Sequence, residues 1–282
     1  MSTPIKHKPS WLKTRIGGCG QYSMTKDIAG RLNTICVAGK CPNRAECWSQ
    51  GTATFLIGGQ ICTRSCKFCN TPTGRPLPLD PAEPELVAQS IRRMNLKHAV
   101  VTSVDRDDLQ DGGAEHWALT IRAIRHTCAS TTLEVLIPDF RGDLALIDKL
   151  IDEGPHIVGH NLETVRRLTP AVRSLAGYDR SLKVIAHAAR RVPCKTGIMV
   201  GLGETEAEVL EVMDDALRAG ARMLTIGQYL PPSQKMLPVS EYVSPEKFRA
   251  WKEIALGKGY RSVESAPLVR SSYHAKAKEV DE

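Results

Sequence analysis

The stretch Cys62-Thr63-Arg64-Ser65-Cys66-Lys67-Phe68-Cys69 places three thiols within eight residues, spaced three and then two residues apart. Thiolates are the usual protein ligands of iron–sulfur clusters, and a cubane with four irons takes four ligands. This stretch supplies only three, so one iron remains open to bind another molecule, as in a catalytic centre. A zinc knuckle is the alternative, but zinc sites usually pair Cys-x2-Cys with a second ligand pair, and none follows here.

A second group of three thiols lies upstream, at Cys36, Cys41 and Cys47, in the pattern Cys-x4-Cys-x5-Cys. Gly39 and Pro42 favour a loop in which these thiols can converge. Two incomplete triads separated by only fifteen residues, from Cys47 to Cys62, predict two clusters close together in space. We refer to them as the Cys36 triad (Cys36, Cys41, Cys47) and the Cys62 triad (Cys62, Cys66, Cys69).

Length and composition predict one large domain, or one domain with extensions, because 42% of the 282 residues are hydrophobic. No apolar run approaches the roughly 20 residues of a membrane helix, and residues 1–11 lack the apolar core of a signal peptide. We therefore expect a soluble, cytoplasmic protein. Six of the nine cysteines fall in the triads, a pattern that indicates metal binding in a reducing compartment rather than disulfides. Cys19, Cys128 and Cys194 are interpreted as buried or free thiols.

The formal net charge of +7 favours acidic partners, either nucleic acid or an acidic protein. Aromatic residues make up only 5% of the chain, and no basic run is interleaved with them. A stacking platform for single-stranded nucleic acid is therefore poorly supported. An ordinary solvated surface is the alternative explanation of the charge.

Short apolar runs alternate with helical patterns from residue 52 onward. Strands are expected at 55–57, 98–103, 132–137, 157–158, 196–200 and 222–226. Helices are expected at 84–94, 113–127, 143–153, 179–190, 204–219 and 245–256, with a short additional helix near 25–34. Six β–α units with short connections predict a parallel sheet with right-handed crossovers, two units fewer than the eight of a closed barrel.

The Cys-x3-Cys-x2-Cys spacing, with Phe68 directly before the last cysteine, resembles the signature of the radical S-adenosylmethionine (SAM) superfamily. The resemblance implies that the open iron of the Cys62 triad chelates the amino and carboxylate groups of SAM, with Phe68 beside the cofactor. It also implies an α/β partial (βα)6 barrel, here at 51–258. Residues 1–50 would form an N-terminal extension that carries the Cys36 triad, and 259–282 a C-terminal extension.

Chemistry in parallel α/β folds gathers at the carboxyl ends of the strands, where this chain places several polar residues. Asn161 and Glu163 are the first candidates for SAM binding, and Ser103 and Asp105 are the next. The glycines at 201 and 203 resemble the superfamily's motif near the adenine, so Gly201 is included. Arg180 is a candidate for the carboxylate of SAM, with a surface ion pair as the alternative. His160 is interpreted as a hydrogen-bonded structural histidine rather than a ligand.

The Cys36 triad together with Arg270-Ser271-Ser272-Tyr273 resembles the lipoyl synthase family. In that family a serine completes an auxiliary [4Fe-4S] cluster, and we assign this role to Ser272, with Ser271 as the alternative. A serine oxygen is a harder ligand than a thiolate and matches iron less well. It can therefore be released when the cluster is taken apart, which makes Ser272 catalytic as well as a metal ligand.

The resemblance implies two [4Fe-4S] clusters, SAM, and insertion of two sulfur atoms at C6 and C8 of a protein-bound octanoyl-lysine. These carbons bear no acidic proton, so a cofactor must supply the chemistry. The implied partners are an octanoylated lipoyl carrier domain or glycine-cleavage carrier protein, a ferredoxin- or flavodoxin-type reductant and an iron–sulfur carrier, with no membrane or nucleic acid. The alternatives are another radical SAM sulfur-inserting enzyme and a non-catalytic protein that binds metal and nucleic acid.

Overall fold

The structure is a computed structural model that describes residues 7–12, 33–41, 43–49, 54–173 and 175–272. The helix predicted near 25–34 and Cys19 fall outside these ranges. No helix within them is long and apolar enough to cross a membrane.

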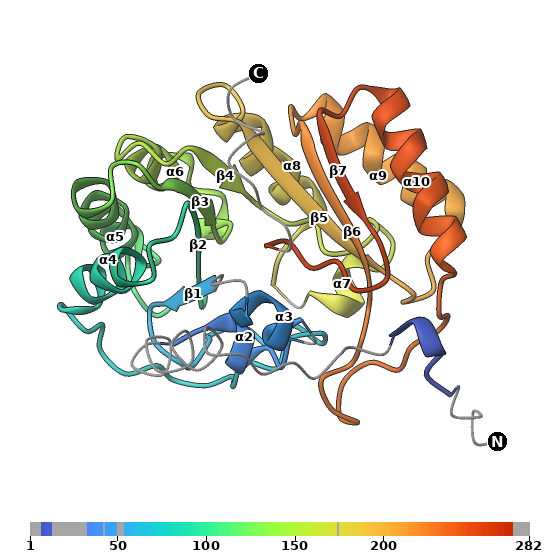
Figure 1. Cartoon of the computed structure of the whole chain (residues 1–282), viewed down its shortest axis with the longest axis horizontal. Coiled ribbons are helices and arrows are strands. Elements are labelled where there is room, and N and C mark those ends of the chain that lie inside the picture. Colours follow the sequence, from blue (N-terminus) through green and yellow to red (C-terminus); the bar gives the residue numbers. More distant parts are fainter. Residues whose placement is uncertain (1–6, 13–32, 42, 50–53, 174, 273–282) are drawn as a thin grey trace.

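The described chain is built around one parallel sheet of seven strands, arranged in the order of the sequence (Figure 1). Each strand pairs with the next one along the chain, which leaves β1 and β7 as the two edges of an open barrel. The strands are β1 (Thr54–Ile57), β2 (His98–Ser103), β3 (Thr132–Leu136), β4 (Ile157–Gly159), β5 (Cys194–Val200), β6 (Met223–Gln228) and β7 (Ser262–Ser265).

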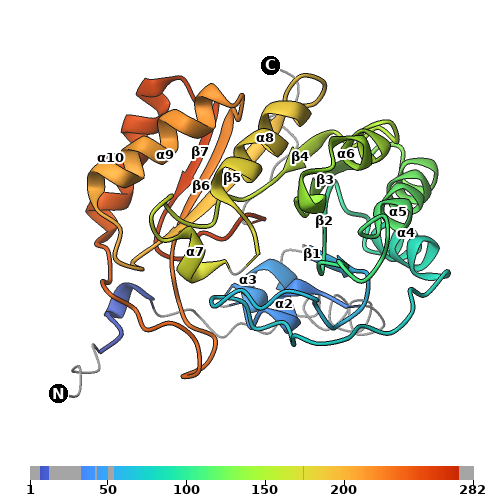
Figure 2. The ribbon, with the colours of Figure 1, turned by 180° about the vertical axis from the view of Figure 1, so that it is seen from behind.

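Six longer helices connect consecutive strands and cover the outer face of the sheet (Figures 1 and 2). They are α4 (Glu83–Arg93), α5 (Ala114–Thr127), α6 (Leu144–Ile151), α8 (Tyr178–Ala188), α9 (Glu206–Arg218) and α10 (Pro245–Lys258). The six predicted β–α units are therefore confirmed. The seventh strand, β7, was not predicted. It is only four residues long, and only half of those residues are buried.

Side chains cap the starts of α6, α9 and α10. Asp143 is the N-cap of α6 and accepts a hydrogen bond from the backbone N–H of Ala145. Thr205 and Glu208 form a capping box at the start of α9. Between these helices and the sheet, the core is filled by large side chains that include Trp117 and Trp251.

Short elements complete the chain: η1 (Ser10–Leu12), α2 (Ile35–Ala38), α3 (Arg44–Ser49), η2 (Phe140–Gly142) and α7 (Thr169–Val172). Two segments lie along the edges of the open sheet. On one side, Thr34 forms an antiparallel bridge with Phe55 of β1, just before α2. On the other, the backbone N–H of Gln228 donates to the carbonyl of Pro267, 3.2 Å away. The two segments that flank the gap therefore carry the Cys36 triad and Ser272.

Candidate active site

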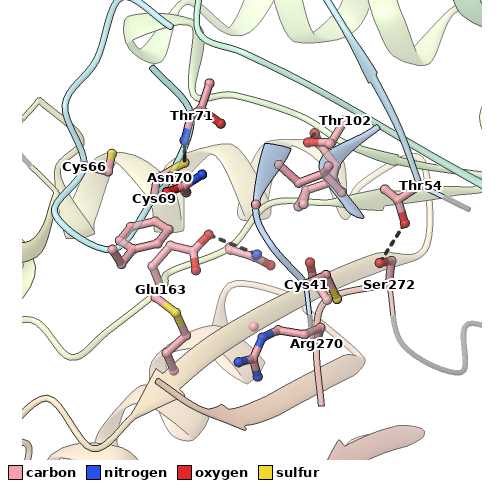
Figure 3. A pocket seen from close by; sticks show the side chains of 18 of the residues that line it. Cys41, Thr54, Cys66, Cys69, Asn70, Thr71, Thr102, Glu163, Arg270 and Ser272 are labelled. Atoms are coloured by element: carbon pink, nitrogen blue, oxygen red, sulfur yellow. Dashed lines mark hydrogen bonds between the residues drawn. The ribbon is translucent and has the colours of Figure 1, made fainter. Parts of the chain in front are cut away.

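A cavity of about 520 Å³ occupies the interior of the open barrel. Its floor comes from the inner faces of the strands, including Thr102 of β2, Leu136 of β3 and Thr225 of β6. Its walls come from both cysteine loops and the C-terminal segment. Figure 3 shows Cys66 and Cys69 on one side of the cavity and Cys41 and Ser272 on the other.

Backbone hydrogen bonds hold the Cys62 loop at the mouth of this cavity. The N–H of Cys62 donates to the carbonyl of Pro72 at 2.8 Å, which closes the loop on itself. The N–H of Thr63 donates to the carbonyl of Asp105 at 3.1 Å, and that of Lys67 to Val172 in α7 at 2.9 Å. The loop is thus fixed to the end of β2 and to the segment after β4.

The sulfur atoms of the Cys62 triad accept hydrogen bonds from the backbone. The N–H groups of Asp105 and Arg64 lie 3.3 and 3.4 Å from the Cys62 sulfur, and the N–H of Thr71 lies 3.5 Å from the Cys69 sulfur. Such bonds help to set the reduction potential of a bound cluster. Burial raises the pKa of Cys62 to about 11, so the thiol must lose a proton when it binds iron.

Arg64, inside the cysteine stretch, joins the loop to the ends of β2 and β3. Its side chain is buried and pairs with Asp107 and Asp139, each at 2.7 Å, and with Asp105 at 3.3 Å. The hydrogen bond from Arg64 holds the pKa of Asp107 below its usual range. Burial instead raises the pKa of Asp105, although Arg64 opposes that shift. Sequence analysis did not single out Arg64, although it lies between two cluster cysteines.

Asn161 and Glu163 follow β4 and line the cavity, as the sequence predicts for residues at a strand end. The amide of Asn161 donates to the Glu163 carboxylate at 3.1 Å. Glu163 has a left-handed backbone, with φ of 66°, and its N–H and C=O pair with Gly197 and Met199 of β5. A strained non-glycine residue held in this way is typical of a functional site. Burial raises the pKa of Glu163.

Phe68, Ser103 and Asp105 also line the cavity, but two predicted residues do not. Arg180 pairs with Asp139 at 3.3 Å, and its side chain is 39% exposed. Gly201 packs under Gln228, where a Cβ atom would overlap the Gln228 amide. The glycine is thus required by this close approach outside the cavity.

Arg173, which sequence analysis missed, faces the cavity instead of Arg180. Its Nη1 donates to the carbonyl of Asn161 and to the hydroxyl of Ser181, both at 3.1 Å. Its Nε is buried and has no hydrogen-bond partner among the described residues. The Arg173 guanidinium therefore lies beside Asn161, and its Nε–H remains available to donate a hydrogen bond to a ligand.

His160 is a structural residue, in line with the interpretation from sequence. Its two ring nitrogens lie 2.9 Å from the carbonyl oxygen of Ile137 and from the hydroxyl of Ser181. Burial lowers its pKa to about 4. A neutral imidazole with both nitrogens engaged connects the ends of β3 and β4 to α8.

The Cys36 triad is folded by α2, by α3 and by the turn between them. The N–H of Cys41 donates to the carbonyl of Cys36 at 3.2 Å, and that of Cys47 to Asn43 at 2.9 Å. Burial raises the pKa of Cys47 to about 12, and the neighbouring Cys41 and Cys36 add to that shift. Cys36 and Cys41 line the cavity, and none of the six cysteines in the two triads forms a disulfide.

Ser272 belongs to the segment that follows β7. It lines the cavity and contacts the first residue of β1. Its hydroxyl accepts a hydrogen bond of 2.8 Å from the hydroxyl of Thr54 (Figure 3). Ser271 lines the same cavity, and Arg270 lies near enough to interact electrostatically with Cys41. Tyr273 falls outside the described residues.

The donor sets suit iron–sulfur clusters. The three thiols of the Cys62 triad line the cavity, as do Cys36 and Cys41 of the Cys36 triad, and Ser272 adds an oxygen to the same lining. Among the described residues, no three His, Cys, Asp or Glu side chains come close enough to hold a single metal ion. A cubane does not require that convergence, because each of its irons takes its own protein ligand.

Comparison with known proteins defines the class first. Residues 56–216 match the model of the radical SAM superfamily, so the chain belongs to that superfamily. Its fold resembles that of methylornithine synthase (PylB), with a TM-score of 0.56, 12% identity and coverage of 93% of this chain and 83% of that one. Streptococcus suis SuiB bound to S-adenosylmethionine gives a TM-score of 0.59 at 10% identity, covering 85% of this chain and 58% of that one.

The chain is also similar to curated proteins along nearly its whole length. It is 65% identical over 271 residues to the lipoyl synthase of Parabacteroides distasonis, covering 95% of this chain and 96% of the relative. The lipoyl synthase of Porphyromonas gingivalis is 61% identical over 272 residues, with 95% and 96% coverage. The chain therefore belongs to the lipoyl synthase family. It is a radical SAM sulfurtransferase, and its cofactors are SAM and [4Fe-4S] clusters.

Proposed function

We propose that this chain inserts two sulfur atoms, at C6 and C8, into an octanoyl group carried on a lysine of a carrier protein. The observation that carries the proposal is that thiols of two separate triads line one cavity, Cys62, Cys66 and Cys69 from the first and Cys36 and Cys41 from the second, together with Ser272. One triad would make the substrate reactive, and the other would hold the sulfur to be transferred.

The Cys62 triad would hold the cluster that works with SAM, and together they supply the one-electron chemistry that an unactivated carbon needs. The backbone N–H groups of Arg64, Asp105 and Thr71 would stabilise the cluster sulfurs through the hydrogen bonds described above. Phe68 would shield the site from water, because its side chain lines the cavity next to Cys69.

We place SAM along the ends of β2, β4 and β5. Arg173 would bind its carboxylate through the free Nε, because a charge-assisted hydrogen bond satisfies a buried guanidinium. Glu163 and Asn161 would take the ammonium and the ribose hydroxyls, and Ser103 and Asp105 are further polar groups that line the cavity. Arg180 and Gly201 act on this site only through their neighbours.

The Cys36 triad and Ser272 would hold the auxiliary [4Fe-4S] cluster, which is here the sulfur donor and thus a substrate. The wall between the two triads includes the apolar side chains of Leu56, Leu136 and Val269, against which an octanoyl chain can lie. A volume of about 520 Å³ falls within the usual range for such ligand sites.

The macromolecular partners follow from the same proposal. The enzyme would act on an octanoylated lipoyl carrier domain or a glycine-cleavage carrier protein, and it would receive electrons from a ferredoxin- or flavodoxin-type reductant. An iron–sulfur carrier would rebuild the donor cluster after each turnover. Of the exposed lysines near the cavity, Lys8 and Lys40 line its mouth and form no ion pair within the described part of the chain.

The decisive experiment is anaerobic incubation of the reconstituted protein with SAM, a reductant and an octanoyl-lysine peptide, followed by mass analysis of the peptide. We expect a gain of two sulfur atoms with loss of two hydrogens, from a brown protein with about eight irons per chain. A product with one sulfur as the end point would favour another radical SAM sulfur-inserting enzyme. A colourless zinc protein that leaves SAM intact would contradict the proposal.

A further inference from the structure

The hydrogen bond between Thr54 and Ser272 joins two residues that are 218 positions apart in the sequence. Thr54 is the first residue of β1, and it is only 4% exposed. Its hydroxyl lies 2.8 Å from the Ser272 hydroxyl, and both residues line the cavity that also contains Cys36 and Cys41. The contact therefore lies at the boundary between the sheet and the auxiliary site.

Other contacts position the backbone that carries Ser272 but not its side chain. The amide of Asn43 donates to the carbonyl of Leu268 at 2.6 Å, which ties the C-terminal segment to the Cys36 loop. Gly227 of β6 allows the carbonyl of Val269 to pass at a distance that any Cβ atom would block. A serine side chain still has three staggered orientations about χ1, so these contacts leave the direction of its oxygen open.

We propose that Thr54 is a positioning residue that directs the oxygen of Ser272 toward the cluster held by the Cys36 triad and stabilises it there. The inference rests on the proposed role of Ser272 as the fourth ligand. An oxygen bound to iron carries negative charge and keeps a lone pair, so it accepts a hydrogen bond from the Thr54 hydroxyl more strongly than a neutral oxygen does.

The identity of the residue suits this role. A threonine is branched at Cβ, so its hydroxyl is held more firmly than that of a serine. A serine oxygen is also a poorer match for iron than a thiolate. The stability of the iron–oxygen bond therefore depends more on a residue that hydrogen-bonds to the ligand. Loss of such an outer partner typically weakens a metal site by about 10- to 100-fold.

The test uses the full chain with Cys62, Cys66 and Cys69 replaced by alanine, so that only the auxiliary cluster remains. After anaerobic reconstitution, the readout is the rate at which a chelator removes iron, followed by the cluster's absorbance. Thr54→Val removes the hydroxyl at nearly constant volume, and we expect it to speed iron loss about 10- to 100-fold. Thr54→Ser keeps the hydroxyl but holds it less firmly, so its rate of iron loss should lie between those of the parent and Thr54→Val and closer to the parent.

Ser272→Ala separates this inference from the proposed function. If Ser272→Ala loses iron no faster than the parent, Ser272 is not a ligand and the proposed auxiliary site fails. If Ser272→Ala is fast but Thr54→Val matches the parent, the ligand assignment stands and the role of Thr54 is overturned. In the double variant, Thr54→Val should add nothing to Ser272→Ala. An equal effect of Thr54→Val in both backgrounds would show a general weakening of β1 and would also overturn the inference.

Discussion

The side-chain amide of Asn70 donates a hydrogen bond of 2.8 Å to the carbonyl of Ala38. Asn70 directly follows Cys69, the last thiol of the Cys62 triad, and Ala38 ends the short helix that contains Cys36. The bond therefore connects the two cysteine-containing segments, the proposed cluster sites, directly. Because reactions between two centres are sensitive to displacements of about 1 Å, this link helps to fix the separation over which sulfur must be delivered.

Replacement of Asn70 with alanine should leave both clusters able to form but reduce the efficiency of sulfur transfer. Loss of one neutral hydrogen bond costs about 1 kcal/mol of stability, so iron content should stay near that of the parent while product yield per SAM cleaved falls. Gln60→Ala is the matched control, because the exposed side-chain amide of Gln60 donates a hydrogen bond of 2.7 Å to the side-chain oxygen of Asn33 and so joins the same two segments. Equal yields from Asn70→Ala and the parent would contradict the coupling role.

Gly227→Ala should displace the C-terminal segment and weaken the auxiliary cluster selectively. A Cβ atom at Gly227 would overlap the carbonyl oxygen of Val269, three residues before Ser272. We expect chelators to remove the auxiliary irons first, while the cluster at the Cys62 triad keeps its spectrum with SAM. Gly257→Ala in α10 is the control, since nothing lies within 4 Å of its added Cβ. Parallel loss of both clusters would point to general unfolding.

The sequence predicted which cysteines lie together at the cavity better than it predicted the residues around them. Cysteines at fixed spacing identify a cluster site by themselves, and the alternation of β and α patterns predicts the sheet. By contrast, Arg173 and Arg180 look alike in the sequence. The path of the chain between β4 and α8 decides which of them faces the cavity, and that path depends on tertiary contacts such as the one from Arg173 to Ser181. β7 was not predicted because four residues are too few to show a clear alternation of apolar and polar positions.

Arg173→Gln should weaken SAM binding, whereas Arg180→Gln should not. A hydrogen bond to a charged group contributes about 1.5–3 kcal/mol, so we expect a roughly 10- to 100-fold loss of SAM affinity when the Arg173 cation is removed. Arg180 does not line the cavity and pairs with the buried Asp139, so it is the control. The measurement is the dissociation constant of SAM for the reconstituted protein. A larger loss from Arg180→Gln than from Arg173→Gln would restore the assignment made from sequence.

Lys40→Glu should weaken productive encounter with an acidic carrier domain. Lys40 is exposed at the cavity mouth, directly before Cys41. Opposite charges at an interface accelerate association, and salt screens them. We expect a higher KM for the carrier and a shallower dependence of kcat/KM on salt, with the octanoyl peptide less affected. Lys183→Glu, on the outer helix α8, is the control. A turnover rate at subsaturating carrier that does not change with salt would contradict charge steering.

SAM affinity should fall as the pH becomes acidic, and Glu163 should be the cause. Burial raises the pKa of Glu163 in the free protein, and in the proposed site the ammonium of SAM would bind the ionised carboxylate. Binding therefore favours loss of the proton. As pH falls through the raised pKa, protonation competes with SAM and the affinity decreases, whereas at higher pH the affinity reaches a plateau.

Glu163→Gln should lower the plateau and flatten this part of the pH profile, because the amide does not titrate. Glu208→Gln is the control, since Glu208 pairs with Arg167 outside the cavity and its hydrogen bonds lower its pKa to about 2. The dissociation constant is measured only where iron content is unchanged, so that acid loss of the cluster does not imitate the effect. A profile for Glu163→Gln that keeps the slope of the parent would assign the titration to another group, and Asp105, whose pKa burial also raises, would be examined next.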